Sequence, residues 1–303
     1  MACPSGLQAL HALPDETAHG EGTSLVQIAL SLDAGRESGK VLEKAYSSGG
    51  SLISQLDWDI KPLYYAGTQI KIRLAQRLCL NGGLWSGINA KTGSMEDRDW
   101  SLYGTETNYS KHDAYLDSAR FMDVNAGYTF YHDDISLTPL VGYATMRLKW
   151  HARDGYLEYP PGSAPESVWG TVISYRQEYS FPYAGLHAGY RPWRPFSVSA
   201  ALFLSSYVYC QAVDNHYRRN LDFYDTMRDG RYLFLHLRGG WDINAGLTLS
   251  LSLSYTAIYD LRGDSYSVNT STGAASTVVK GGAGAFYETW GLGLSLSHRI
   301  AGL

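Results

Sequence analysis

The sequence predicts an all-β fold, a transmembrane antiparallel β-barrel of about ten strands with long extracellular loops. Apolar and polar residues alternate with a period of two along nearly the whole chain, which is typical of strands. The composition fits this, because 24 tyrosines suit strands, 32 glycines suit turns, and only 18% of residues are charged. Long and short connections also alternate between the expected strands.

The alternation is clearest in three segments. Ile70, Ile72 and Leu74 alternate with basic residues, whereas the leucines of GLTLSLSLSY alternate with Ser and Thr, and those of WGLGLSLS with Gly and Ser. A soluble sandwich would also alternate, so this pattern alone leaves both folds open. The mean hydropathy of -0.22 fits a barrel, because only every second residue meets lipid. No apolar run reaches the roughly 18 residues of a transmembrane helix.

Connection lengths favour the barrel. We expect one domain over residues 1–303, with residues 1–23 as a flexible N-terminal extension. The expected strands are 24–33, 50–60, 68–82, 116–131, 135–152, 171–191, 195–209, 231–241, 246–259 and 286–300. Long connections are expected at 34–49, 83–115, 153–170, 210–230 and 260–285, and short ones at KPLYYAG, YHDD, RPWRP and DINA. Short turns at one end and long loops at the other are the outer-membrane pattern.

Several function classes are disfavoured by composition. The net charge is -4 and no basic stripe is present, so nucleic acid is not an expected partner. The three cysteines, Cys3, Cys79 and Cys210, cannot all pair within one chain, and a disulfide framework is not expected. The N-terminus lacks the basic region and long apolar core of a signal peptide. Either a signal has been removed, or the first residue given lies downstream of it.

Two short acidic motifs lie in long connections at the same expected end. GSMEDRDW carries Asp97 and Asp99, and AVDNHY carries Asp214 and His216. Residues i and i+2 of an extended chain point to the same side, so each pair is able to face a shared cleft. A histidine beside a carboxylate is suited to act as a base, and neighbouring carboxylates hold a proton or a water. The alternative is that these are solvated turn residues, or that the Asp pair binds a cation.

Longer motifs carry a family resemblance. They are SQLDW at Ser54–Trp58, the M-x-D-x-D-W core of GSMEDRDW, the D-x-H-Y string at Asp214–Tyr217, and the segments GYATMRLKWHARDG, SYRQEYSFPYAGL and GGAGAFYETWGL. Over nearly its whole length the chain resembles the omptin family of outer-membrane proteases. The resemblance implies an endopeptidase without a serine or cysteine acyl-enzyme. In the mechanism that the resemblance implies, His216 is the base and Asp214 orients it. Asp97 and Asp99 hold the attacking water and stabilise the oxyanion.

The resemblance also implies a substrate class. Omptins cleave after basic residues, which acidic groups in a pocket recognise. Glu43 matches one acidic position and Met95 matches an apolar wall, but Ala212 stands at the second acidic position. We therefore expect cleavage of polypeptides after basic residues, with weakened discrimination. His112 matches a loop histidine that either supports the cleft or is an ordinary loop residue.

Lipopolysaccharide is the other partner that the resemblance implies. Tyr143, Arg147 and Arg228 match contacts with lipid A phosphates, whereas Thr145 and Glu178 depart from the pattern. Ordinary interfacial side chains are the alternative reading. No metal and no cofactor are expected, apart from lipopolysaccharide for activity. The expected location is the bacterial outer membrane, with the active site facing the cell exterior.

One conflict remains in the pattern. Val198, Leu202 and Leu204 would face lipid on even numbers, and strict continuation would turn His216 outward too. A bulge or turn between Ser205 and Val213 must therefore reset the phase.

Two rival functions are a catalytically silent omptin-like adhesin or structural barrel, and a diffusion pore. The pore is disfavoured, because side chains largely fill the lumen of about ten strands.

Overall fold

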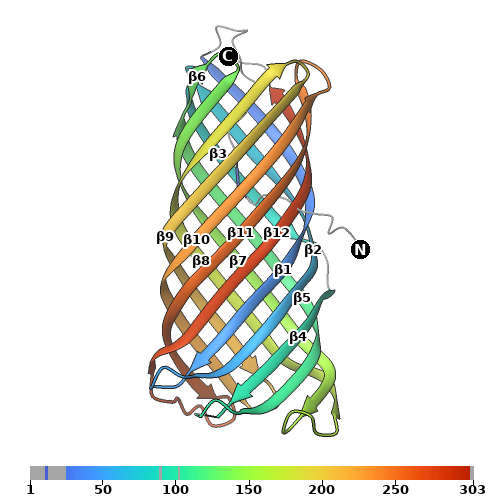
Figure 1. Ribbon diagram of the computed structural model, residues 1–303, viewed down its shortest axis with the longest axis vertical. Helices are drawn as coiled ribbons and strands as arrows, with labels where there is room; N and C mark the ends of the chain where they lie inside the picture. Colours follow the sequence, from blue (N-terminus) through green and yellow to red (C-terminus); the bar gives the residue numbers. More distant parts are fainter. Residues whose placement is uncertain (1–10, 13–24, 89–90, 102, 301–303) are drawn as a thin grey trace.

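The computed structural model describes residues 11–12, 25–88, 91–101 and 103–300. In this part of the chain all twelve regular elements are strands of one antiparallel sheet (Figure 1). They are β1 (Val26–Tyr46), β2 (Leu52–Leu74), β3 (Leu78–Gly87), β4 (Lys91–Trp100), β5 (Glu106–Tyr128), β6 (Phe130–His132), β7 (Ile135–Glu158), β8 (Glu166–Trp193), β9 (Phe196–His216), β10 (Leu221–Asp242), β11 (Leu247–Asn269) and β12 (Val279–Ile300). The described residues include no helix long and apolar enough to cross a membrane.

The sheet closes into a barrel. β1 pairs with β12 on one side and with β2 on the other, and the remaining strands follow their neighbours around the ring. β3 and β4 both pair with β2 and with β5, so they are two halves of one barrel strand. β6 continues β5 along β7. The twelve described segments therefore make ten barrel strands, which confirms the predicted fold class.

The predicted strand ends differ from the structure. β2 runs unbroken through KPLYYAG, and the chain turns at Ala75–Arg77 instead, with positive φ angles of 46° and 62° at Ala75 and Gln76. β3, β4 and the first part of β5 occupy most of the connection expected at 83–115. The other expected long loops are also mostly strand, because the barrel wall continues past the lipid. There both faces of the wall meet water, so the alternation that marks strands fades.

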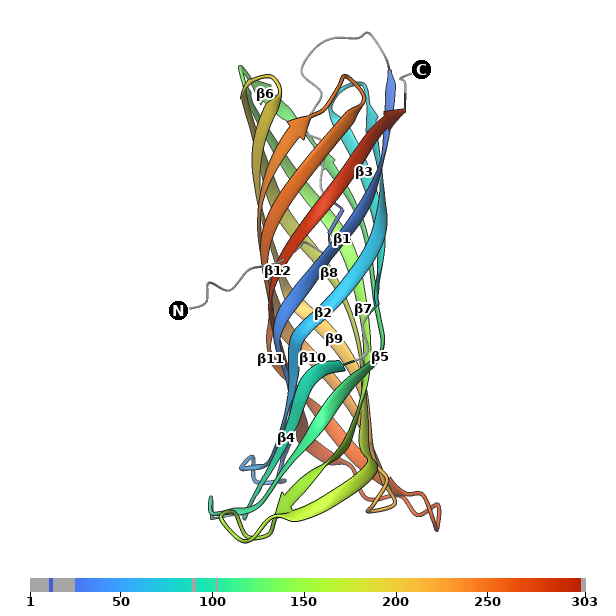
Figure 2. The ribbon, with the colours of Figure 1, turned by 90° about the vertical axis from the view of Figure 1, so that its right-hand side faces the viewer.

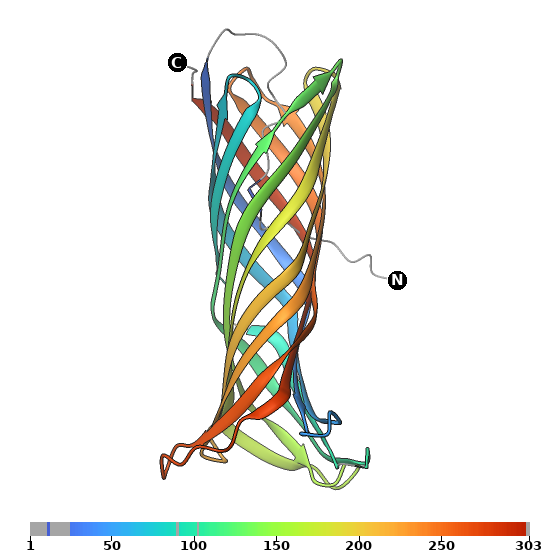
Figure 3. The same ribbon diagram turned by 90° about the vertical axis from the view of Figure 1, so that its left-hand side faces the viewer.

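An apolar belt surrounds the end of the barrel that carries the short turns, drawn uppermost in Figures 1 and 3. Leu30, Leu84, Leu204, Leu237 and Leu296 are exposed there on the outer face. Four large aromatic side chains, Tyr64, Trp193, Trp241 and Trp290, are exposed on the outer face. Trp58, Tyr65 and Trp150 are instead fully buried inside the barrel. Strand alternation sends neighbours to opposite faces, and end position alone does not choose the face.

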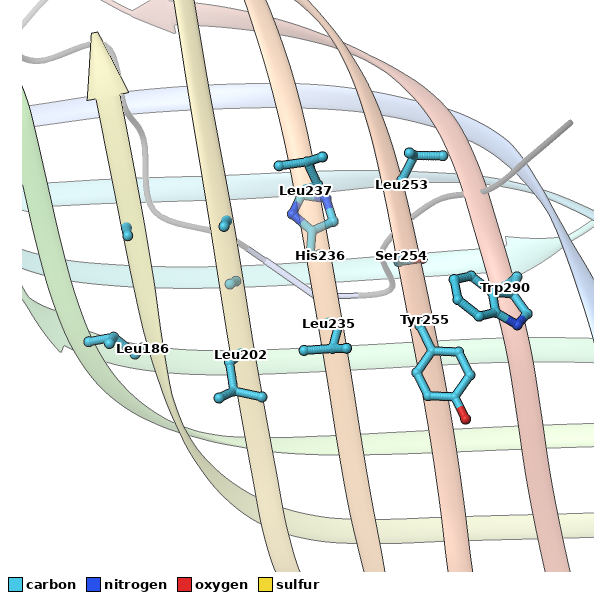
Figure 4. A pocket seen from close by; sticks show the side chains of 12 residues that line it. Leu186, Leu202, Leu235, His236, Leu237, Leu253, Ser254, Tyr255 and Trp290 are labelled. Atoms are coloured by element: carbon cyan, nitrogen blue, oxygen red, sulfur yellow. The ribbon is translucent and has the colours of Figure 1, made fainter.

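A groove of about 590 Å³ lies on this lipid-facing wall. Leu186, Leu202, Leu235, Leu253 and Trp290 line it side by side from five consecutive strands, β8 to β12 (Figure 4). It is almost wholly apolar and contains none of the predicted site residues. We therefore assign it to lipid contact.

The lumen is filled by polar and aromatic side chains. Ser250, Ser252 and Ser254 alternate inward on β11, opposite the leucines that face lipid. The expected extension, residues 1–23, lies outside the described residues apart from His11 and Ala12, which are buried. The Nδ1 atom of His11 lies 2.8 Å from a carboxylate oxygen of Asp123 on β5. A filled lumen does not provide an open pore.

A bulge in β9 resets the phase, as the sequence requires. Up to Phe203 the odd-numbered residues are buried, and from Val208 onward the even-numbered ones are. Between Leu204 and Tyr209 the strand contains one residue more than the facing part of β8. The hydroxyl of Ser205 donates to the carbonyl of Tyr207 (2.9 Å) and accepts from its N–H (3.1 Å). Asp214 and His216 consequently point inward.

Candidate active site

The first carboxylate pair lies on β4, near the end of the barrel opposite the short turns (Figure 2). β4 is inserted between β2 and β5, so Asp97 and Asp99 each face a polar neighbour. The Ser54 hydroxyl donates to Asp97 at 3.4 Å, and the Asn108 amide donates to Asp99 at 3.1 Å. Both aspartates are half-buried. Their i, i+2 spacing turns both toward the lumen side of the same strand.

The second pair ends β9. The Nε2 atom of His216 is hydrogen-bonded to a carboxylate oxygen of Asp214, and both side chains are buried. The imidazole also packs edge-on against Phe223 of β10, with ring centroids 5.2 Å apart. The ring is therefore fixed on two sides. When Asp214 accepts the proton of Nε2, the neutral ring carries its lone pair on Nδ1.

The two pairs meet in one cleft of about 430 Å³. Asp97, Asp99 and His216 line it, and Asp214 stands directly behind His216. The remaining lining comes from four neighbouring segments and is Asn108, Ser110, His112, Leu157, Tyr159, Val172, Ile173, Arg218 and Arg219. His112 is thus part of the cleft wall, with its ring bonded to the carbonyl of Asp154. A cavity of this size accommodates a peptide segment and a water.

The site lies outside the membrane-spanning part of the barrel. Asp214 is ten residues past Leu204, the last lipid-facing leucine of β9. At roughly 3.3 Å per residue, a strand of that length is comparable to the thickness of the lipid core. The cleft is therefore in an aqueous environment, beyond the apolar belt.

The electrostatics tune both pairs for proton exchange near neutral pH. Burial, followed by the nearby charge of Asp99, raises the pKa of Asp97 to about 7. For His216, burial favours the neutral ring, but the charge and hydrogen bond of Asp214 outweigh it and raise the pKa. The carboxylate pair therefore holds a proton that it exchanges readily, and the imidazole is a strengthened base.

The predicted pocket residues lie next to this cleft. Glu43 on β1 is buried and hydrogen-bonds to Asp214. Burial and the charges of neighbouring carboxylates raise the pKa of Glu43 well above its usual value. Met95 is fully buried on β4, two residues before Asp97, and Ala212 is buried on β9, two residues before Asp214. All three therefore share the inner side of the wall with the two acidic pairs.

Comparisons with known proteins agree with this arrangement. The family model described as "Omptin family" matches residues 24–300. The chain belongs to the omptin family. It is 27% identical over 275 residues to a plasminogen activator of Yersinia pestis, covering 88% of this chain and 87% of the relative. It is also 27% identical over 253 residues to the outer membrane protease OmpP of Escherichia coli, covering 78% and 79%.

A solved structure agrees with the fold. The outer membrane protease OmpT of Escherichia coli superposes with a TM-score of 0.84 at 22% identity, covering 90% of this chain and 97% of that one. At this identity the likeness establishes the barrel and not the chemistry. Membership of the family supports a protease function and an outer-membrane location for this omptin.

The residues matched to lipopolysaccharide contacts lie on the outer wall, away from the cleft. Tyr143 and Arg147 are exposed on β7, and Arg228 is exposed on β10. Arg147 pairs with Glu178 at 3.2 Å, and Arg228 lies over the ring of Tyr209 at 5.8 Å. β8 and β9 lie between Arg147 on β7 and Arg228 on β10. The two arginines therefore form two separate basic positions on one side of this omptin.

Sequence reasoning missed several cleft residues. Asn108 faces Asp99 across the β4–β5 pair, and Ser54 faces it across the β2–β4 pair. No motif shows such contacts, because they depend on strand register. Arg218 and Arg219 directly follow the DNHY string, so their charge was visible in the sequence and their proximity was not.

The two described cysteines lie outside the cleft lining. Cys79 and Cys210 are buried free thiols, and Cys3 lies outside the described residues. Within the described ranges, no group of three or more His, Cys, Asp or Glu is placed to hold a metal ion.

Proposed function

We propose that this omptin is an outer-membrane endopeptidase that cleaves exposed polypeptides after basic residues and activates a water with two acidic pairs. One observation carries the proposal. The His216–Asp214 pair and the Asp97–Asp99 pair line or back the same cleft of about 430 Å³, outside the lipid belt. The chain carries all four catalytic residues that the family resemblance implies, which disfavours a silent adhesin or a purely structural barrel.

The chemistry follows from the positions of the protons. A water between the pairs loses a proton to Nδ1 of His216 as its oxygen attacks the peptide carbonyl carbon. Asp214 stabilises the imidazolium that forms. The proton shared by Asp97 and Asp99 hydrogen-bonds to the oxyanion of the tetrahedral intermediate. Collapse breaks the C–N bond, and the imidazolium returns its proton to the leaving amine, so charge and protons balance.

The substrate side chain before the scissile bond is proposed to enter beside Glu43. A guanidinium or ammonium there would meet a buried carboxylate, and such charge-assisted hydrogen bonds are strong in desolvated surroundings. Met95 would contact the apolar stem of that side chain. The substrate class is therefore polypeptides with Arg or Lys at this position.

Lipopolysaccharide is proposed as the membrane partner. Arg147 and Arg228 lie on the outer wall at two separate basic points, where phosphates would bind by charge-assisted contacts. Tyr143 would support them from the same strand as Arg147. Because these residues lie outside the cleft, their effect on catalysis would be through the conformation of the barrel wall.

The test is cleavage of an Arg-containing peptide by barrel purified in detergent, with and without lipopolysaccharide. We expect His216→Ala and Asp99→Asn each to lose about 10²-fold or more in rate, which is typical for removing a positioned acid–base group. His132→Ala is the matched control, since His132 is exposed at the short-turn end. Near wild-type rates in both cleft variants would contradict the mechanism. A wild-type rate independent of lipopolysaccharide would contradict only the proposed role of lipopolysaccharide as the membrane partner.

A further inference from the structure

Ala212 stands where the family resemblance expects an acid, but a carboxylate lies directly across from it. In the β9–β10 ladder Ala212 pairs with Asp225, and both side chains are buried. Side chains of directly opposed residues leave the same face of a sheet, with Cβ atoms about 5 Å apart. The inner wall therefore regains a carboxylate close to the position where Ala212 lacks one.

The carboxylate of Asp225 is only partly engaged in structural contacts, through a hydrogen bond with Ser265. It is 8% exposed, and its Oδ1 atom has no hydrogen-bond partner among the described residues. The same is true of Oε2 of Glu43, which is 7% exposed. Buried polar atoms are normally satisfied, so these two unpartnered oxygens, beside the cleft on the inner wall, are free to accept hydrogen bonds from a ligand.

The charged neighbours that act most on these two groups are carboxylates. They are Asp214, Asp225 and Asp97 for Glu43, and Asp214 for Asp225. Burial, partly offset by the Ser265 hydrogen bond, raises the pKa of Asp225 only to about 6, so it is ionised at neutral pH. Unpaired buried charge is costly, and a cation inserted between these groups would relieve that cost.

The surroundings suit a long side chain with a flat cationic head. Tyr175 is fully buried and near both acids, since the charges of Glu43 and Asp225 both act on its hydroxyl. Its ring stacks on Trp58, with centroids 5.8 Å apart. Aromatic faces bind guanidinium groups, and a guanidinium has five donors to share between two carboxylates.

We propose that Asp225 is the second carboxylate of the pocket for the basic substrate side chain, replacing the acid that is absent at Ala212. This inference rests on the proposed function and reverses one expectation from the sequence. Discrimination in favour of Arg is retained, because Glu43 and Asp225 hold the guanidinium from two different strands.

The activity test compares two peptides that differ only by Arg or citrulline before the scissile bond. Citrulline keeps the shape of Arg and removes its charge. We expect Asp225→Asn to lower the Arg-to-citrulline ratio of kcat/KM about tenfold, with little change for citrulline itself. Ala212→Asp added to Asp225→Asn should restore much of the ratio. Asp222→Asn, on the same strand but outside this pair of acids, is the control and should leave it unchanged.

A binding measurement keeps the inference testable without turnover. Calorimetry would measure arginine amide binding to the His216→Ala barrel with lipopolysaccharide present, with and without Asp225→Asn. We expect about tenfold weaker binding in the Asp225→Asn protein. An unchanged ratio and unchanged binding would overturn the role of Asp225 even if the wild type is a protease. Failure of the wild type to cleave any peptide, with binding still dependent on Asp225, would overturn the proposed function alone.

Discussion

His216 experiences two opposing influences, and their balance sets the working pH. Burial favours the neutral ring, whereas the negative charge of Asp214 favours the imidazolium and prevails. The folded pKa is therefore above the usual 6.5. A general base must be neutral, so activity is expected above this pKa and is lost as pH falls through it. Full activity at pH 4 would be incompatible with this role.

Arg219 provides a finer test at the same scale. It is exposed at the cleft, and its positive charge lowers the pKa of both His216 and Asp97. Arg219→Gln should therefore move the acidic limb of the pH profile of kcat/KM to higher pH. The shift should shrink in 1 M salt, where charges are screened beyond roughly 3 Å.

The matched control for Arg219 is Arg194→Gln, in the short turn between β8 and β9 at the other end of the barrel. Arg194→Gln should leave the pH profile of kcat/KM unchanged. An acidic limb that stays fixed, or moves to lower pH, in Arg219→Gln would contradict the electrostatic role.

Residue motifs predicted only part of the site. Asp97, Asp99, Asp214 and His216 occur in short strings whose i, i+2 spacing turns each pair to one side, and the structure brings them to one cleft. Asp225 was not predicted, because its relation to Ala212 depends on the register between β9 and β10. That register is set by the turn at 217–220, whose conformation the sequence pattern does not show.

At the scale of elements, hydrophobic alternation predicted the lipid-facing stretches and not the strand ends. The number of barrel strands was right, but the turn at Ala75–Arg77 was placed too early, since it contains no Gly, Pro, Asn or Asp. The bulge in β9 was predicted correctly, because Leu202 and Leu204 cannot otherwise face the opposite side from Asp214 and His216.

Ser205 holds this bulge, which gives a stability prediction. Ser205→Ala removes both hydrogen bonds to the backbone of Tyr207. We expect the free energy of unfolding to fall by about 1 kcal/mol, the usual contribution of such contacts. Urea unfolding in lipid vesicles measures it. Ser206→Ala, the exposed neighbour, is the control and should stay within about 0.5 kcal/mol of wild type. Equal effects of both substitutions would argue against the role of Ser205.

For the whole molecule, the barrel acts as a rigid frame that gathers distant residues. The site and its proposed pocket draw on β1, β4, β9 and β10, whose contributing residues range from Glu43 to Asp225 in the sequence. Closure through β1 and β12 leaves the wall without free edges, which holds these side chains in register. The belt of leucines at the other end fixes the frame in lipid, so the cleft stands clear of the membrane.

The central claim is tested most directly on intact cells. A membrane-impermeant fluorogenic peptide with a single Arg would be added to bacteria that display equal amounts of wild-type or His216→Ala barrel. We expect the wild-type cells to cleave the peptide after Arg at least about 10²-fold faster than the variant cells. Equal rates in the two strains, or no cleavage by folded wild-type protein in its own outer membrane, would contradict an exterior-facing protease that depends on His216.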